Sequence, residues 1–155
     1  MRSLNIVWKI SAIGLFLVTL QSSCLADYNK ENMDVSPNFL YLTSRDSLLR
    51  LEVSSIVYFA ADGNYTYIVC ANKMKYTVGM TLAKMQCALM GSLGEKASWF
   101  VRIGKSHIVS MRYINKIDVP RQTLLLSDGR SFVFRLDVSK EALRKLKDLL
   151  VMSNK

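Results

Sequence analysis

From residue 38 onward, short runs of β-branched, aromatic and aliphatic residues alternate with polar turn sequences. Runs of about four to eight such residues, separated by turn formers, are typical of β-strands. Hairpin turns are predicted at Asn72-Lys73 and at Asp128-Gly129, because Asp-Gly pairs adopt tight turns readily. The predicted strands are 39–43, 48–53, 56–60, 65–71, 75–78, 100–103, 108–110, 116–119, 123–126 and 131–134. This pattern predicts a mainly β domain.

Two segments change to the period of an α-helix. Residues 81–90 place four apolar side chains on one helical face, with Thr81 as the candidate N-cap and Gly91 beyond the end. Residues 138–152 place three leucines on one stripe and their basic residues largely off it. We therefore expect one internal helix and one C-terminal helix.

Residues 1–26 form a separate compositional zone. Arg2 and Lys9 precede an apolar run over 10–20, and small and polar residues follow it. This order is typical of a secretory signal peptide, and the run is shorter than the ~20 apolar residues of a membrane span. Three interpretations stay open: an export signal, an inner-membrane anchor, or a segment without such a role, which is either an accidental extension from a start codon placed too far upstream or a remnant of a longer sensor.

The predicted domain begins after a polar linker. Residues 27–37 are rich in Asn, Asp, Glu and Lys and end at Ser36-Pro37, which favours a loop. We therefore expect one domain over 38–152. The formal net charge of +9 favours an acidic partner, which could be nucleic acid, an anionic membrane surface or an acidic protein.

Motifs for catalysis or metal binding do not emerge from the sequence. The three cysteines are widely spaced and His107 is the one histidine, so the paired ligands of a zinc site are missing. Gly104-Lys105-Ser106 lacks the preceding glycine of a phosphate-binding loop, because residue 99 is Trp. His107 is interpreted as a packed or hydrogen-bonded side chain in a strand. We expect no enzymatic activity, no metal and no cofactor.

A first polar group follows the predicted turn Asp62-Gly63-Asn64. The Asn64 amide can donate and accept at a base edge, Tyr65 can reach a phosphate, and Thr66 can contact a thymine methyl. The alternative is that Asp62-Gly63-Asn64 is only a tight turn without a role in binding, which is the commoner case for such a sequence.

Two further polar groups lie near strand ends. Arg102, Lys105 and Ser106 could clamp a phosphate, and Lys105 could reach a guanine. Arg130, Arg135 and Lys140 form the other group, beside the terminal helix, and Arg135 follows an apolar strand that could hold it rigidly. The structural alternative for the group at Arg102 is a solvated basic edge strand, and for the group at Arg135 it is a surface ion pair.

Taken in order, these segments resemble the LytTR DNA-binding domain of bacterial response regulators, the regulators of two-component systems. The resemblance covers the chain after the linker, and its stretches are 55–68, 81–82, 100–110, 113–114, 117, 125–129 and Arg135. It implies an elongated, multi-stranded β fold that presents loops to successive DNA major grooves. It also implies DNA contacts from Asn64, Tyr65 and Thr66, from Lys105 and Ser106, and from Arg135 with Lys140.

The predicted function is sequence-specific regulation of transcription on double-stranded DNA in the cytoplasm, with a homodimer on tandem sites as one form. Residues 1–37 are far fewer than the ~100 residues of a receiver domain, so we expect none in this chain. The alternative is a membrane-tethered or exported β-domain that binds protein or anionic lipid. Residues 1–26 motivate it, since a span there would place the domain away from DNA.

Overall fold

The computed structural model describes residues 38–154, which belong to one compact unit, Ser36–Lys155. The interpretations of residues 1–26 and of the linker 27–37 lie outside the described residues and stay predictions. Between residues 38 and 154, no helix has the length and apolar character needed to cross a membrane.

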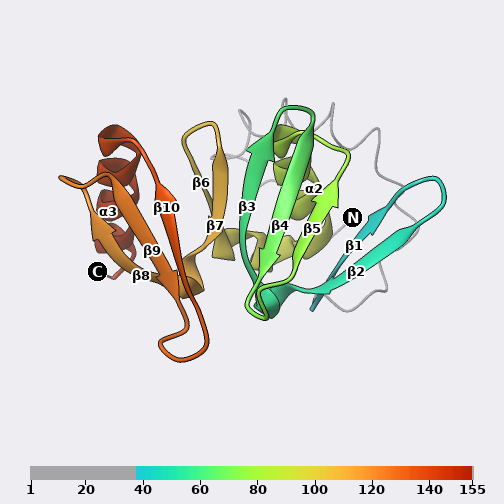
Figure 1. The fold of residues 1–155 in the computed structure, drawn as a ribbon, viewed down its shortest axis with the longest axis horizontal. Helices are drawn as coiled ribbons and strands as arrows, with labels where there is room; N and C mark the ends of the chain where they lie inside the picture. Colours follow the sequence, from blue (N-terminus) through green and yellow to red (C-terminus); the bar gives the residue numbers. More distant parts are fainter. Residues whose placement is uncertain (1–37, 155) are drawn as a thin grey trace, which may run out of the picture. The chain divides into compact units, whose positions relative to one another are not determined.

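Strands predominate in the described residues, with one internal and one C-terminal α-helix, which confirms the predicted fold class (Figure 1). Short 3-10 helices cover Val53–Ser55, Gly94–Trp99 and Met111–Tyr113. The α-helices are α2 (Leu82–Leu93) and α3 (Lys140–Ser153). The strands are β1 (Phe39–Thr43), β2 (Leu48–Glu52), β3 (Ile56–Asp62), β4 (Tyr65–Cys70), β5 (Lys75–Val78), β6 (Phe100–Ile103), β7 (His107–Ser110), β8 (Ile114–Asp118), β9 (Thr123–Ser127) and β10 (Val133–Asp137).

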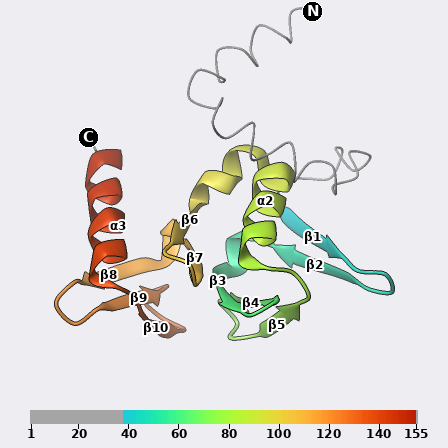
Figure 2. The same ribbon diagram turned by 90° about the horizontal axis from the view of Figure 1, so that it is seen from above.

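The strands form three antiparallel sheets, which Figures 1 and 2 show from two sides. A five-stranded sheet has the order β5-β4-β3-β7-β6, a three-stranded sheet has the order β10-β9-β8, and β1 pairs with β2. In the larger sheet Ala60 lies opposite His107, and Asp62 lies opposite Tyr65 across a two-residue turn. This register brings the β3–β4 and β6–β7 turns to the same end of the sheet.

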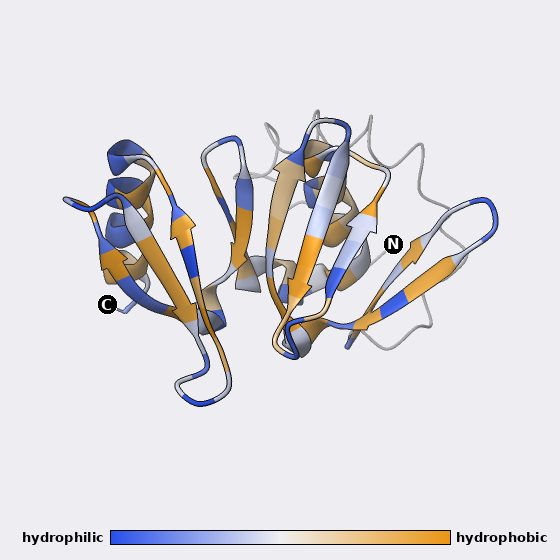
Figure 3. Cartoon of the chain, in the orientation of Figure 1, coloured by the Kyte–Doolittle hydropathy of each residue, from blue (hydrophilic) through white to orange (hydrophobic). Residues whose placement is uncertain are grey.

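Two hydrophobic cores lie on either side of the five-stranded sheet. Ile108 packs in the first core with α2 and the β1–β2 hairpin, and its neighbour Val109 packs in the second with α3 and the three-stranded sheet. Successive residues of a strand face opposite sides, so one strand serves both cores. Apolar residues accordingly recur along the strands with hydrophilic residues between them, and hydrophilic residues gather in the turns (Figure 3).

The end of the internal helix differs from the prediction. Thr81 is the N-cap as predicted, since its side chain accepts a hydrogen bond from the Lys84 amide at 3.4 Å. The helix, however, continues through Gly91 to Leu93. Leu93 is buried in the first core, and this burial outweighs the ~1 kcal/mol cost of a helical glycine. Gly94, with a φ of 53°, ends the helix instead.

The last strand and the last helix also begin later than predicted. One carboxylate oxygen of Asp128 accepts hydrogen bonds from the amides of Arg130, Ser131 and Phe132, which keeps Ser131 and Phe132 in the turn. These bonds, the one from Arg130 first, hold the pKa of Asp128 well below its usual range. Helix α3 begins at Lys140 because Ser139 caps it by accepting from the Ala142 amide at 3.3 Å. Other strand ends shift by a residue or two.

Candidate nucleic-acid interface

The β3–β4 turn presents Asn64 and Tyr65 to solvent. Gly63 takes a positive φ of 58°, which lets the turn close in two residues. The Tyr67 hydroxyl donates to Asp62 at 2.5 Å, and this bond raises the pKa of Tyr67. Asp62 is therefore directed back onto the sheet, whereas Asn64 is exposed and Tyr65 is 55% exposed.

Thr66, the third member of this predicted group, lies inside the fold. It is fully buried, and its hydroxyl donates to the Met80 carbonyl at 2.8 Å. This bond joins β4 to the segment that precedes α2. Thr66 thus supports the turn from behind, and its methyl group has no exposed surface for a thymine.

The β6–β7 turn, Gly104-Lys105-Ser106, lies beside the β3–β4 turn. The Ala61 amide donates to the Ser106 carbonyl at 2.8 Å, so the β6–β7 turn is bonded to the end of β3, just before the β3–β4 turn. Lys105 and Ser106 are both exposed. Among residues 38–154 neither side chain has a hydrogen-bond or ion-pair partner, which leaves both available to a ligand.

Arg102 differs from its neighbours because its guanidinium already has partners in the chain. It donates to the carbonyls of Gly104 and Lys105, each at 3.3 Å, and to the side-chain oxygen of Gln86 at 3.1 Å. The predicted phosphate contact of Arg102 would compete with these bonds.

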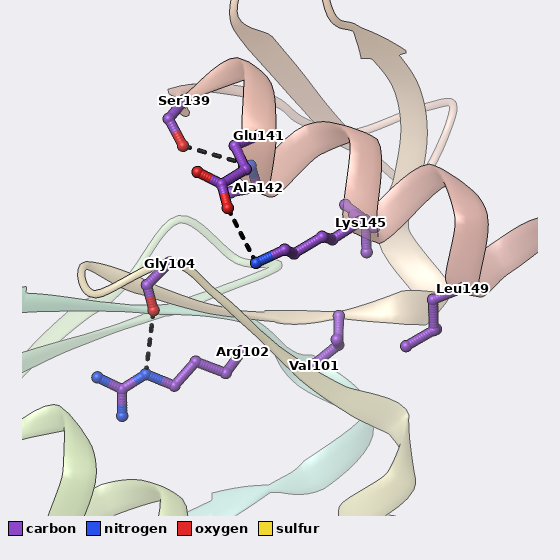
Figure 4. A pocket seen from close by; sticks show the side chains of 9 residues that line it. Val101, Arg102, Gly104, Ser139, Glu141, Ala142, Lys145 and Leu149 are labelled. Atoms are coloured by element: carbon purple, nitrogen blue, oxygen red, sulfur yellow. Dashed lines mark hydrogen bonds and ion pairs between the residues drawn. The ribbon is translucent and has the colours of Figure 1, made fainter.

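The third predicted group meets the second at the start of α3. Lys140 is the exposed first residue of that helix. A Cβ placed on Gly104 would lie 4.0 Å from the Ala142 Cβ, so the β6–β7 turn lies close to the first turn of α3. Between them lies a cavity of about 240 Å³, which Figure 4 shows with Arg102 and Lys145 at its wall.

Arg135 projects from the outer face of β10 with its side chain 66% exposed. One of its terminal nitrogens donates to the Thr123 hydroxyl at 3.3 Å, and its Nε lies 4.0 Å from the Asp137 carboxylate. Thr123 directly follows the β8–β9 turn, so this bond directs the guanidinium toward the end of the sheet from which α3 begins.

The β8–β9 turn adds a cation that sequence reasoning missed. Arg121 is 79% exposed there, and its Nε lies 4.0 Å from Asp118. The Val138 amide donates to the Gln122 carbonyl at 2.9 Å, which holds this turn against the segment leading into α3. The sequence carried a signal, since Pro120 and Arg121 lie between two predicted strands, but nothing in it showed which end of the sheet this turn would reach.

The interface side chains are suited to an anionic, extended ligand. Lys105 and Arg121 supply positive charge from two turns, Arg135 from β10 and Lys140 from the start of α3, and Asn64 supplies an amide that can read a base edge. Three acids lie nearby: Glu141 is paired with Lys145 at 3.0 Å, and Asp118 and Asp137 lie 4.0 Å from the Nε atoms of Arg121 and Arg135. Within the described residues, His, Cys, Asp and Glu form no group of three that could hold a metal.

His107 lies behind the β6–β7 turn as a packed side chain. Its ring centroid is 6.4 Å from that of Tyr58, and it pairs in register with Ala60 and Ile103. Burial lowers the pKa of His107 below its ordinary 6.5. The unfolded chain therefore takes up a proton at a higher pH than the folded chain does.

This difference predicts a pH dependence of stability. The contribution of neutral His107 is fully present above pH 6.5 and is lost as the pH falls through the lower folded-state value. We expect His107→Phe, which keeps a ring beside Tyr58, to flatten the fall in unfolding free energy between about pH 7 and pH 5. Urea unfolding across this range measures it. Equal slopes for the two proteins would show that His107 does not cause the dependence.

Comparison with known proteins agrees with this fold. The LytTr DNA-binding domain family matches residues 46–151. A heme-containing CO-sensing transcriptional regulator, RcoM 1 of Paraburkholderia xenovorans, is 28% identical over 107 residues, which are 68% of this chain and 37% of that regulator. The chain thus spans little more than a third of that relative.

A solved structure of a LytTr DNA-binding domain from Bacillus cereus has the same fold. It superposes with a TM-score of 0.50 at 23% identity, over 73% of this chain and 96% of that one. The family match covers most of the described residues and, apart from Leu40 and Leu42, the buried residues of both hydrophobic cores. The chain belongs to the LytTR family of DNA-binding domains, whose members bind DNA to regulate transcription.

Proposed function

We propose that this protein binds a specific DNA sequence by presenting its β3–β4 and β6–β7 turns to the major groove, with the start of α3 beside them. The supporting observation is the position of the β6–β7 turn: the Ala61 amide of β3 donates to its Ser106 carbonyl, and a Cβ on Gly104 would lie 4.0 Å from the Ala142 Cβ, so this turn lies near both the β3–β4 turn and the start of α3. A β scaffold of this kind holds short connections rigidly, which lowers the entropic cost of docking them on a duplex.

The exposed side chains divide by chemistry. Asn64 is the candidate base reader, because an amide pairs with the N6 and N7 edge of adenine. Tyr65, Lys105, Ser106, Arg121 and Lys140 are candidate phosphate contacts, and Arg135 can read a guanine or clamp a phosphate with its planar fork. Thr66 and Arg102 hold the turns in place rather than touch DNA. The site of action is then the cytoplasm, where the DNA lies.

A selection followed by a salt titration tests this function. The full chain is used to select duplexes from a random pool, and affinity for the best duplex is measured against salt concentration. Each contacted phosphate steepens the logarithmic slope by ~0.9, so contacts from several turns predict a slope steeper than about −3. Failure to enrich any sequence, together with salt-independent binding, would contradict the proposal.

Binding to the selected duplex also tests whether the protein binds DNA as a homodimer. Two copies on tandem half-sites would give two protein chains per duplex and half-sites about 10 base pairs apart, or a multiple of that spacing. One chain per duplex would instead show that a single domain suffices.

Membrane contact through residues 1–26 is the second candidate, which the apolar sequence of that segment favours. Cell fractionation of protein tagged at either end tests it. A processed, exported product would exclude DNA binding as the native role.

A further inference from the structure

We propose that Arg102 and Gln86 form a brace that sets the orientation of the β6–β7 turn, so that Arg102 is a positioning residue for DNA recognition and not a DNA contact. This inference rests on the proposed function for its consequence in binding. Its structural part can be measured without DNA.

The carbonyls of the turn are all held by hydrogen bonds from outside it. Arg102 donates to Gly104 and Lys105, and the Ala61 amide donates to Ser106. Because the side chains of Lys105 and Ser106 have no partner among residues 38–154, these backbone bonds hold the turn. A planar guanidinium can reach two neighbouring carbonyls at once, which an ammonium group on a flexible stem does less well.

Gln86 connects the brace to the internal helix. Its side-chain oxygen accepts from Arg102 at 3.1 Å, and its neighbours Met85 and Leu89 are buried in the first core. Gln86 and Arg102 also line one wall of a cavity of about 260 Å³ between α2 and β6. The turn is thereby held against a packed helix rather than left to its own short hairpin.

The brace also explains why a neutral partner suits Arg102. Gln86 satisfies a guanidinium N–H without neutralising its charge, so Arg102 still adds to the positive potential that attracts DNA. A residue that positions the turn affects affinity through geometry. A residue that touches a phosphate also affects the number of counterions released.

Two variants separate these roles in the full chain. Arg102→Lys keeps the charge but loses the planar fork, and Gln86→Leu removes the acceptor without touching any charge. Hydrogen exchange of the free protein is measured at the Ala61 amide. The Ala71 amide, which donates to Ser55 at the other end of the sheet, is the control. We expect exchange at Ala61 to rise about tenfold in both variants, the effect of losing roughly one hydrogen bond of support, with Ala71 unchanged.

DNA binding by the same variants completes the test. We expect both to bind the selected duplex about tenfold more weakly, with an unchanged salt slope and unchanged affinity for random duplex. Gln86→Glu keeps an acceptor for Arg102, so the Ala61 amide of this variant should exchange as slowly as in the wild type. Wild-type exchange at Ala61 in both variants would overturn the brace. If Arg102→Gln lowers the salt slope by about one unit while Arg102→Lys binds normally, Arg102 is instead a phosphate contact. If the wild type selects no duplex, the proposed function fails while the exchange result still decides the brace.

Discussion

Replacing Arg135 with alanine is expected to weaken binding to the selected duplex by about tenfold to a hundredfold, the cost of losing one well-placed arginine contact. Arg135 stands on the outer face of β10, and its neighbour Leu136 is buried in the second core. The Thr123 bond holds one end of the guanidinium and leaves other N–H groups free to point outward. A side chain held in this way loses little conformational freedom when it binds.

Arg130→Ala is the matched control for this prediction. Arg130 is an exposed arginine of the same hairpin, but it lies in the β9–β10 turn, at the far end from α3 (Figure 1). Its loss removes the same formal charge and should change affinity only slightly. Equal losses for the two variants would mean that net charge, and not position, determines binding. Fluorescence anisotropy with a labelled duplex at fixed salt makes the comparison.

Leu143→Ala is expected to destabilise the protein by about 2–5 kcal/mol, because it removes a buried side chain and leaves a cavity. Leu143 is fully buried and joins α3 to the second core. That core also holds Val57 and Val109 of the five-stranded sheet, so the substitution weakens the attachment of α3 to the sheet. A loss of this size is a large part of the total stability of a typical domain, about 5–15 kcal/mol.

Leu149→Ala on the same helix separates burial from helix propensity. Leu149 is 43% exposed, and both substitutions replace leucine by alanine in α3. Its cost should stay below about 1 kcal/mol, since part of the side chain is already in water. Urea unfolding monitored by circular dichroism compares the two variants. Similar losses would show that Leu143 does not anchor the helix as described.

Much of the fold was predictable because its signals are local. Alternating apolar residues, the Asp-Gly turn and the Thr81 cap each depend on a few neighbouring residues, and the structure has the expected strands and helices there. The predicted end of α2 was wrong because the burial of Leu93 is a tertiary effect that no local signal carries. The order of strands in the sheets depends on long-range pairing and was not predicted from the sequence.

The candidate site shows the same division. Residue chemistry and the family resemblance pointed to three groups, and the structure brings the β3–β4 turn, the β6–β7 turn and the start of α3 together. Neither could show that Thr66 is buried or that Arg102 bonds to its own turn. Arg121 was missed because its place beside the segment leading into α3 depends on the pairing of β8 with β9.

The central claim is that one end of this β scaffold, carrying four connections, is the surface that binds DNA. Amide chemical shifts of the full chain, followed while the selected duplex is added, test it most directly. We predict the largest changes at Asn64, Lys105, Arg121 and Lys140, with Gly129 in the β9–β10 turn unchanged. Changes centred on Gly129, with those four amides unmoved, would contradict the account.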